Sequence, residues 1–390
     1  MSKQNFASTV HPTPSRAPVD RSALPVPLLV CLSRQFGGVD VRILDTARGL
    51  KQREISYLVA VLEGSPLHVA LKAEGLAVHA IARGRADPRI VVDLCKLVRR
   101  IGATVIDAHN MQSQYWGALA ALACRVPCRV ATVHSVYRDT HPKAGRRHLH
   151  EFALYTCRLA GFRFLTVSTT VTEYLRRLGI PSNRIELSWN AISSLPEAPR
   201  SYDLIADTGW PRDAIILGTI GRLEPVKGLD ILIDALSGLV AGGDKLTHLL
   251  IVGTGRMENQ LKQQVSMLGL NKRVHFAGFR QDVTSILTQI DLFCLPSLSE
   301  GLPYSLLEAS RQGVPTLSSK LDGLTALFHH DETIYFVPAS DNAALEKALK
   351  LLVSDAALRC RIGEAARNFA AQKLSISRMI DETLTAYRPL

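Results

Sequence analysis

The amino-acid sequence predicts an α/β protein made of two doubly wound, Rossmann-like domains that face each other across a cleft. The chain has 390 residues, more than one hydrophobic core usually organises and a suitable length for two domains. Short apolar segments alternate with segments of helical periodicity, which is typical of a parallel sheet with helices on both faces. This alternation occurs twice, on either side of a polar, proline-containing segment that resembles a linker.

The first domain is expected to span residues 23–195. Two of its segments, Val92–Ile101 and Ser113–Ala123, have helical periodicity. The apolar segments around them are short enough to be buried strands. The predicted strands are Pro27–Leu32, Ala77–Ala82, Val105–Ala108, Cys128–Val133 and Phe164–Ser168.

Residues 196–212 are predicted to be the linker, and residues 213–375 the second domain. Its predicted strands are Ile215–Ile220, His248–Val252, Val274–Ala277, Leu292–Leu295 and Thr316–Ser318. Its predicted helices include Gly228–Leu239, Arg256–Leu268, Val283–Ile290 and Pro303–Arg311. Open parallel sheets bind ligands at the carboxyl ends of their strands, so we expect a binding site between the two domains.

The two ends of the chain are expected to lie outside these domains. Residues 1–22 are polar and proline-rich, so they are predicted to be a disordered tail and not a signal peptide. Residues 376–390 are predicted to be a helix that packs back on the first domain. The sequence contains no apolar stretch near the ~20 residues that span a bilayer, so a cytoplasmic location is expected.

Positive charge is concentrated in the first half of the chain. Residues 1–200 contain 27 Lys and Arg against 14 Asp and Glu, a net charge of +13, whereas the whole chain has +11. A basic half favours an anionic partner. Nucleic acid is not expected, because aromatic residues make up only 6% and no stacking platform is evident. The seven cysteines do not form a complete zinc-ligand pattern, so no metal site is predicted.

The segment Pro296–Glu308 carries the clearest chemical signal. A strand ends before Pro296, and Pro303 lies where a helix should begin. Gly301 would allow a ligand to approach the backbone, and the free N–H groups at the helix start would favour an anion such as a diphosphate. Glu308 lies in an apolar run, where its carboxylate needs a hydrogen-bond donor such as a sugar or ribose hydroxyl.

Two further segments supply charged or titratable groups at strand ends. Arg222 and Lys227 flank the turn after Ile215–Ile220, where they could neutralise a departing diphosphate without a metal ion. His109 and His134 each follow a strand of the first half. From there they could bind a hydroxyl group or assist proton movement.

Dinucleotide binding is the main alternative for such sheets. Gly253-Thr-Gly255 follows a strand and opens a helix, but Glu258 replaces the third glycine of the dinucleotide fingerprint. The pattern therefore gives little support to a nicotinamide cofactor, and no cofactor is predicted.

The whole set of motifs resembles the retaining family 4 glycosyltransferases, which have the glycosyltransferase B fold. The matching features are Gly221-Arg222 with Lys227-Gly228, Gly253 with Gly255, Gly278-Phe279, and two glutamates eight positions apart, Glu300 and Glu308. The resemblance covers nearly the whole chain. It implies transfer of a sugar from a nucleoside diphosphate, with UDP favoured, to a hydroxyl acceptor.

The resemblance also implies roles for individual residues. Arg222 and Lys227 would hold the diphosphate, Glu300 the transferred sugar and Glu308 the ribose. His109 matches the active-site histidine, and Asn190 resembles part of the turn before the linker. The catalytic group would thus be His109, Arg222, Lys227 and Glu300, with His134 and Asn190 on the acceptor side. The other predicted donor-binding residues are Gly37, Gly38, Gly253, Gly255, Phe279, Arg280, Gly301, Leu302, Pro303 and Glu308.

One segment departs from the family pattern. Asp322–Phe328 replaces a glycine-rich turn that leads to a glutamate, which leaves the choice of sugar open. Two alternatives therefore remain, a non-catalytic partner subunit with the same fold and a nucleotide-sugar epimerase.

The acceptor is inferred from the basic half. The segment 141–155 combines a basic cluster with an apolar continuation. That combination suits contact with an anionic membrane surface and a lipid-linked or cell-envelope acceptor. An ordinary helix with one solvated basic face is an equal alternative.

Overall fold

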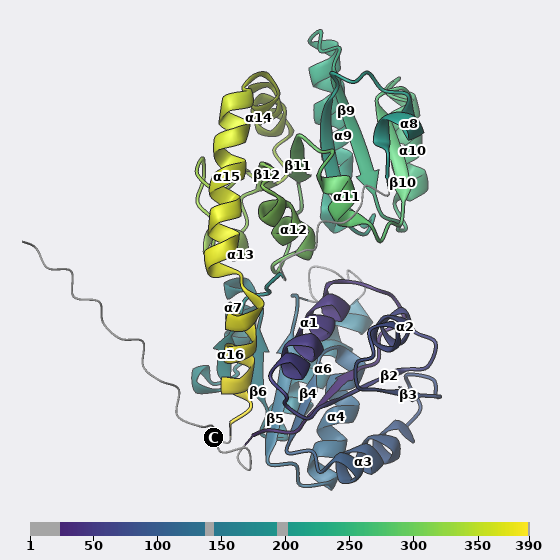
Figure 1. The fold of residues 1–390 in the computed structure, drawn as a ribbon, viewed down its shortest axis with the longest axis vertical. Helices are drawn as coiled ribbons and strands as arrows, with labels where there is room; N and C mark the ends of the chain where they lie inside the picture. Colours follow the sequence, from purple (N-terminus) through teal and green to yellow (C-terminus); the bar gives the residue numbers. More distant parts are fainter. Residues whose placement is uncertain (1–23, 137–143, 193–201, 389–390) are drawn as a thin grey trace, which may run out of the picture.

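The computed structural model describes residues 24–136, 144–192 and 202–388. Two domains are each built on a parallel sheet, with the first domain below and the second above in Figure 1. The first sheet has seven strands in the order β3-β2-β1-β4-β5-β6-β7, and the second has six in the order β10-β9-β8-β11-β12-β13. The predicted α/β class with two doubly wound domains is confirmed.

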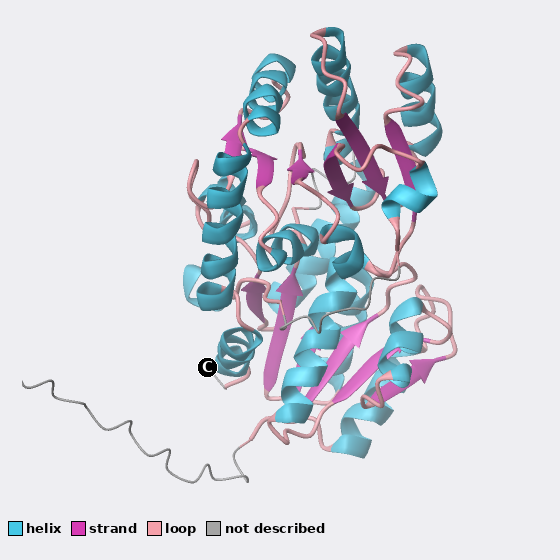
Figure 2. Cartoon of the chain, turned by 45° about the horizontal axis from the view of Figure 1, so that its top comes forward, coloured by secondary structure: helices cyan, strands magenta, loops and turns pink. Residues whose placement is uncertain are grey.

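The first domain alternates strands with helices along its length (Figure 2). Its strands are β1 (Pro27–Cys31), β2 (Leu58–Leu62), β3 (Val78–Ile81), β4 (Val105–Ala108), β5 (Cys128–Val133), β6 (Arg163–Thr166) and β7 (Ile185–Leu187). Its helices are α1 (Gly38–Gln52), α2 (Pro66–Ala73), α3 (Ile90–Ile101), α4 (Met111–Ala123), α6 (Ala144–Leu159) and α7 (Thr169–Arg177).

The second domain follows the same plan. Its strands are β8 (Ile215–Ile220), β9 (Thr247–Val252), β10 (Val274–Gly278), β11 (Leu292–Leu295), β12 (Thr316–Ser319) and β13 (Tyr335–Val337). Its helices are α8 (Leu204–Thr208), α9 (Leu229–Ala241), α10 (Glu258–Met267), α11 (Val283–Leu287), α12 (Tyr304–Gln312), α13 (Asp322–Thr325), α14 (Asn342–Ser354) and α15 (Ala356–Lys373). Among the described helices, none is long and apolar enough to cross a bilayer.

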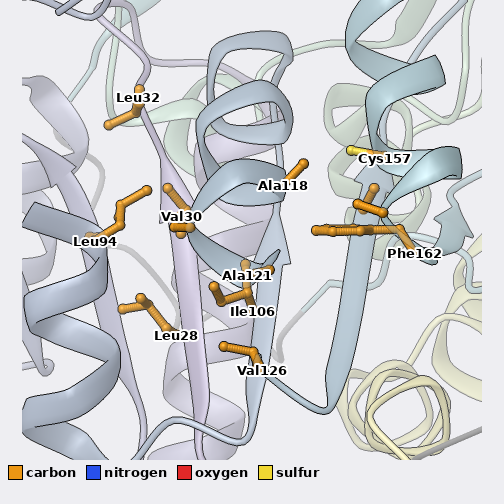
Figure 3. Close-up of a cluster of buried hydrophobic side chains, with 14 of the residues drawn as sticks. Leu28, Val30, Leu32, Leu94, Ile106, Ala118, Ala121, Val126, Cys157 and Phe162 are labelled. Carbon is orange, nitrogen blue, oxygen red and sulfur yellow. The ribbon is translucent and has the colours of Figure 1, made fainter. Parts of the chain in front are cut away.

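The central strand β1 shows why the sheet is covered on both faces. Successive side chains of a strand point to opposite faces. Leu28 and Val30 lie in one core cluster with Leu94 of α3 (Figure 3). Leu29 and Cys31 lie in a second cluster, with residues of α1 and α2. All five residues of β1 are buried, as the continuous apolar run of a parallel strand predicts.

The C-terminal helix α16 (Ile376–Ala386) returns to the first domain (yellow in Figure 1). It packs on α1, where Gly49 leaves room for Ile380: a Cβ at position 49 would lie 2.4 Å from the Ile380 side chain. Arg53, which directly follows α1, also pairs with Asp381 at 2.6 Å. The end of the chain therefore belongs physically to the first domain.

Several details differ from the sequence analysis. It did not identify β2, β7 or β13, which are three to five residues long. Part of the predicted linker, from Tyr202 onward, packs on the second domain, because Tyr202, Leu204 and Trp210 are buried in its core. The predicted tail, 1–22, and the first part of the linker lie outside the described residues.

Candidate active site

The strand order of each sheet reverses at one point, and the candidate site residues follow the strands that meet there. In the first sheet the reversal lies between β1 and β4, and in the second between β8 and β11. The loops after β8 and β11 carry Arg222, Lys227 and Glu300, and His109 follows β4. Doubly wound sheets bind ligands at such reversal points, because adjacent loops diverge there and leave a crevice.

Lys227 and Glu300 connect the loops after β8 and β11 in the second domain. The Lys227 Nζ donates a hydrogen bond to the Glu300 Oε1 at 2.5 Å, and the Ser297 hydroxyl donates to the same oxygen at 2.7 Å. The side chain of Lys227 is 18% exposed and that of Glu300 11%. Solvent screening of this charge pair is therefore weak.

Backbone contacts hold the two loops together. The Leu298 N–H donates to the Val226 carbonyl at 2.8 Å. Gly228 has φ +61, and a Cβ there would lie 2.3 Å from the Pro296 carbonyl oxygen. Only glycine adopts this conformation readily and allows so close an approach. The order Lys227-Gly228 in the sequence therefore brings the lysine to Glu300.

Arg222 is the exposed cation of this site. Its side chain has no ion-pair partner among the described residues, and together with Lys227 and Ser297 it lines a small pocket between the β8 and β11 loops. A guanidinium group without an internal partner is available for a phosphate.

Gly253 and Gly255, which were predicted to bind the donor, pack closely against the neighbouring loop. A Cβ at Gly253, where φ is +131, would lie 1.9 Å from the Gly221 carbonyl oxygen, and one at Gly255 would lie 2.3 Å from the Leu223 carbonyl oxygen. These glycines therefore allow the loop after β9 to pack against the loop that carries Arg222. Because glycine has no Cβ, the backbones of the two loops can approach each other closely.

Helix α12 carries Glu308 toward the first domain. Burial and, second, the nearby Asp45 of α1 raise the pKa of Glu308 to about 7. Burial likewise raises the pKa of Asp45 to about 6. Glu308 has no hydrogen-bond partner within the described part of the chain. A half-buried carboxyl of this kind is suited to accept hydrogen bonds from a hydroxyl pair of a ligand.

Replacing Glu308 by glutamine should stabilise the protein at high pH. The folded protein keeps the Glu308 proton up to a pH of about 7, whereas the unfolded chain loses it near ~4.3. The free energy of unfolding therefore falls as the pH rises between those values. At pH 8 the Glu308→Gln protein should be more stable by on the order of 1–3 kcal/mol, and at pH 4 the two should be equal.

Urea unfolding at pH 4 and pH 8 measures this difference. Glu258→Gln is the matched control, because Glu258 lies on a surface helix of the same domain and pairs with Lys262. Equal stability of the Glu308→Gln and original proteins at pH 8 would show that Glu308 titrates normally.

The loop between β11 and α12, residues 296–303, is called the donor loop below. Glycines of both domains allow this loop to lie close to the first domain. Gly38 at the start of α1 lies against Tyr304, with 3.3 Å between a Cβ at position 38 and the ring. A Cβ at Gly301 would lie 2.7 Å from the His134 carbonyl oxygen. Gly37 has open space on its Cβ side. Gly38 and Gly301 therefore each pack against a residue of the other domain, although the two glycines are distant in sequence.

The altered segment Asp322–Phe328 begins with α13, which packs behind the same loop. A Cβ at Gly323 would lie 3.0 Å from the Gly301 carbonyl oxygen and 2.9 Å from the Thr170 hydroxyl. The segment that departs from the family pattern is thus in contact with the donor loop and with α7 of the first domain.

His109 does not face the cleft as expected. Its side chain is only 1% exposed and lies between Asp107 and His134. The His109 Nε2 is 3.3 Å from the Asp107 Oδ2, and its Nδ1 is 3.2 Å from the His134 Nε2. The hydrogen bonds to Asp107 come from the Thr132 and Tyr387 hydroxyls, whereas the buried His109 Nε2 makes no hydrogen bond within the described residues. His134 is half-buried and lies nearer the donor loop.

Asn190 was predicted to lie on the acceptor side. In the structure it is buried, and its side chain connects the two domains through hydrogen bonds. Its Nδ2 donates to the Leu302 carbonyl at 2.8 Å, and its Oδ1 accepts from the Arg42 guanidinium at 3.4 Å. Arg42 is itself fully buried and also donates to Ser188 and Thr383. Asn190 thus uses one N–H and its amide oxygen at the boundary between the domains.

The residues after β10 contribute less than expected. Phe279 is 57% exposed, and the Arg280 guanidinium pairs with Asp282 at 2.6 Å and lies over the Tyr202 ring. Leu302 is buried, and Pro303 caps α12. Within the described ranges, no cluster of three or more acidic, His or Cys residues could hold a metal ion.

Arg42, Asp45 and Tyr387 also belong to this region but were not predicted from the sequence. Arg42 and Asp45 lie in α1, which also carries other charged residues, so their burial has no distinct signal in the sequence. Tyr387 gives no local signal, because its partner Asp107 is 280 positions away.

Comparison with known proteins agrees with this geometry. Residues 36–194 match the family described as "Glycosyltransferase Family 4", and residues 203–369 match "Glycosyl transferases group 1". The two matches correspond to the two domains and together cover most of the chain.

Relatives and solved structures extend over both domains. The UDP-Gal:alpha-D-GlcNAc-diphosphoundecaprenol alpha-1,3-galactosyltransferase of Escherichia coli is 24% identical over 309 residues, 77% of this chain and 79% of that protein. The N,N'-diacetylbacillosaminyl-diphospho-undecaprenol alpha-1,3-N-acetylgalactosaminyltransferase of Campylobacter jejuni is 26% identical over 80% of this chain and 84% of that protein.

A solved structure of Anabaena HepE in complex with UDP-glucose superimposes with a TM-score of 0.79 at 20% identity, covering 93% of this chain and 98% of that one. At this identity the likeness concerns the fold. The two family matches, the full-length relatives and the loops at the sheet reversals together lead to one conclusion: this chain is an enzyme of the family 4 glycosyltransferases with the glycosyltransferase B fold.

Proposed function

We propose that this enzyme transfers a sugar from a UDP-sugar to a hydroxyl group of a lipid-linked or cell-envelope glycan, with retention of the anomeric configuration. The observation that best supports binding of the sugar donor is the Lys227–Glu300 pair beside the exposed Arg222. It combines a positive site for the diphosphate with a carboxylate for the sugar hydroxyls.

In the proposed reaction, the bond between the sugar C1 and the phosphate oxygen breaks as a bond from C1 to the acceptor oxygen forms on the same face. The acceptor proton moves to the departing phosphate oxygen. Lys227 and Arg222 would neutralise the growing phosphate charge in place of a metal ion, so no metal is required. The remaining work is positioning of donor and acceptor.

The anomeric configuration of the product tests the stereochemistry. With an α-linked UDP-sugar, we expect proton NMR of the product to show the small anomeric coupling of an α-linkage. A β-linked product would contradict the proposal. Incubating the enzyme with donor alone tests for epimerase activity, which would convert the sugar without an acceptor.

UDP is proposed as the nucleotide because UDP-sugars appear in relatives. The E. coli relative is named as a UDP-Gal enzyme, and HepE was solved with UDP and with UDP-glucose. Thermal unfolding in the presence of UDP-, GDP- and ADP-sugars checks the assignment. At a hundredfold excess over the dissociation constant, the UDP-sugar should stabilise the protein by ~2.7 kcal/mol, and the others much less. A larger shift with a GDP- or ADP-sugar would overturn it.

The acceptor proposal rests on relatives and on one surface. Relatives are named for acceptors linked to undecaprenyl diphosphate. Helix α6 exposes an apolar stripe in which every member is at least half exposed: Leu149, Phe152, Tyr155 and Leu159. The sequence just before the stripe is basic, with Arg146 and Arg147. We propose that this stripe rests on the anionic inner surface of a membrane, so that the enzyme is a peripheral cytoplasmic protein.

Flotation with liposomes that contain anionic lipid tests the membrane contact. We expect binding at low salt, weaker binding at high salt, and a several-fold loss in Leu159→Ser. Leu351→Ser is the matched control, since Leu351 is an exposed leucine (41%) on the second domain. Equal loss in both variants, or no binding by the original protein at low salt, would refute the contact.

A further inference from the structure

The two passages of the chain between the domains lie side by side. The first passage follows Ile192, after β7, and the second is the junction of α15 and α16 (yellow in Figure 1). The Ile192 N–H donates to the Leu374 carbonyl at 3.0 Å, and Ile192 forms a parallel β-bridge with Ser375. Residues 188–192 therefore lie where the backbone joins the two domains.

Arg42 of α1 holds the chain just before the first passage, and its side chain is buried. The Arg42 Nη1 donates to the Ser188 and Trp189 carbonyls at 3.2 and 3.1 Å. The Arg42 Nη2 donates to the Ser188 hydroxyl at 2.9 Å and to the Thr383 hydroxyl at 3.3 Å. A buried guanidinium needs hydrogen-bond acceptors in place of water, so these contacts fix the Arg42 side chain between residues 188–190 and α16.

The Asn190 amide has one possible orientation between its two neighbours. Its Oδ1 accepts from the Arg42 Nη1 at 3.4 Å, and its Nδ2 donates to the Leu302 carbonyl at 2.8 Å. A guanidinium only donates hydrogen bonds and a carbonyl only accepts them, so both contacts require the same placement of oxygen and nitrogen. Arg42 thereby turns the amide N–H of the first domain toward the donor loop of the second.

The Leu302 carbonyl lies at the end of the donor loop. Helix α12 begins its hydrogen bonds one residue later, at the Pro303 carbonyl, which accepts from the Leu306 N–H at 3.2 Å. The buried Leu302 carbonyl accepts instead from Asn190. A buried carbonyl that loses its donor is costly, so the loop should move when this hydrogen bond is lost. Glu300 lies two residues before Leu302 and would move with it.

We propose that Asn190 is a positioning residue for the donor loop and that Arg42 acts on the loop through it. The Arg42 guanidinium orients the amide, and the amide N–H holds the Leu302 carbonyl, so that Glu300 and the start of α12 keep the arrangement that binds the sugar donor. Neither positioning residue touches the donor. That the donor is a UDP-sugar rests on the proposed function, whereas the position of the donor loop is a property of the protein alone.

Hydrogen exchange of the full chain without substrate tests the position of the loop. Asn190→Asp keeps the size of the side chain and an acceptor for Arg42, but it presents an oxygen instead of an N–H to the Leu302 carbonyl. The backbone N–H groups of residues 297–302 should exchange about 10- to 100-fold faster, because the loss of a buried hydrogen bond makes local opening easier by that factor. Unchanged exchange of this segment would overturn the proposal, even in a protein that transfers sugar.

Calorimetric titration with UDP tests the consequence for the donor site. The dissociation constant of UDP should rise about 10-fold or more in Asn190→Asp. Asn183→Asp is the matched control, because Asn183 is exposed on the same domain and gains the same charge, and it should bind UDP as the original protein does. Faster exchange with unchanged UDP affinity would refute the role in donor binding. Absence of UDP binding by the original protein would contradict the proposed nucleotide, and the exchange result then decides the positioning role.

Arg42→Lys tests whether Arg42 acts through Asn190. Lysine keeps the charge but lacks the two-nitrogen fork that holds the amide and its neighbours. Arg42→Lys and Asn190→Ala should each weaken UDP binding, and the double variant should bind UDP no more weakly than Asn190→Ala alone. Two losses that multiply in the double variant would show that Arg42 supports the domain boundary without acting on the donor loop through Asn190.

Discussion

Replacing Lys227 by alanine should reduce turnover by on the order of 10²–10³-fold, the cost of removing one group that stabilises an anion in the transition state. Lys227 is the cation nearest the centre of the donor loops and bonds directly to Glu300 at 2.5 Å. Its removal withdraws charge from the departing diphosphate. It also leaves the Glu300 carboxylate with the hydrogen bond from the Ser297 hydroxyl. Steady-state measurement of product formation from a UDP-sugar gives the effect on kcat.

Two further variants test whether the loss of turnover comes from the position of Lys227 in the donor site. Lys262→Ala removes a lysine that pairs with Glu258 on the surface of the same domain, and it should leave kcat unchanged. Because Lys227 and Glu300 contact each other, Lys227→Ala combined with Glu300→Gln should be much less damaging than the product of the two single effects. Turnover at the original rate in Lys227→Ala would refute the proposed role of this lysine in the donor site.

Replacing Gly253 by alanine should cost the second domain roughly 2–4 kcal/mol of folding free energy and reduce kcat/KM about 10²-fold or more. The new Cβ would lie 1.9 Å from the Gly221 carbonyl oxygen, in a backbone conformation with φ +131 that other residues rarely adopt. The loop that carries Arg222 would have to move by more than an ångström, which is enough to misplace a phosphate ligand.

Substitutions at two other glycines separate the effect of the steric contact from the effect of the backbone strain. Gly255→Ala introduces a close contact, 2.3 Å from the Leu223 carbonyl oxygen, without a positive φ, whereas Gly269→Ala introduces strain at φ +70 with nothing within 4 Å. We expect Gly255→Ala to impair activity strongly. Gly269→Ala should cost about 1 kcal/mol of stability and leave kcat/KM unchanged. Thermal unfolding and steady-state kinetics on all three variants distinguish these outcomes, and full activity of Gly253→Ala would contradict the packing role.

The signals of the predicted donor site are local in the sequence, and the roles of its residues stay predictions. Lys227-Gly228, Glu300-Gly301 and the helix start at Pro303 lie within single strand–loop–helix units, and the residue types alone indicate charge, close approach and helix capping. The burial of β1 and β11 likewise follows from continuous apolar runs. Strand β2 (Leu58–Leu62) was missed although it is an apolar run as long as β1, whereas β13 has three residues and offers little pattern.

The first domain was harder to predict because its residues act on one another across long sequence distances. His109 was expected at the cleft, but its ring is buried between Asp107 and His134. Asn190 was assigned to the acceptor side, but its amide joins Arg42 to the Leu302 carbonyl. The residues near Asn190 in the sequence do not predict these two contacts, because Arg42 is 148 positions away and Leu302 is 112 positions away.

The sequence by itself determined which residue types stand at the end of each strand, and so the class of fold and the chemistry of a nucleotide-sugar enzyme. The tertiary structure alone decided which of those strand ends are neighbours. The reversal of strand order at β1/β4 and β8/β11 gathers the loops, and the return of α16 places Tyr387 beneath Asp107. Hydrogen-bond direction and burial depend on such contacts between distant segments, which local sequence patterns do not specify.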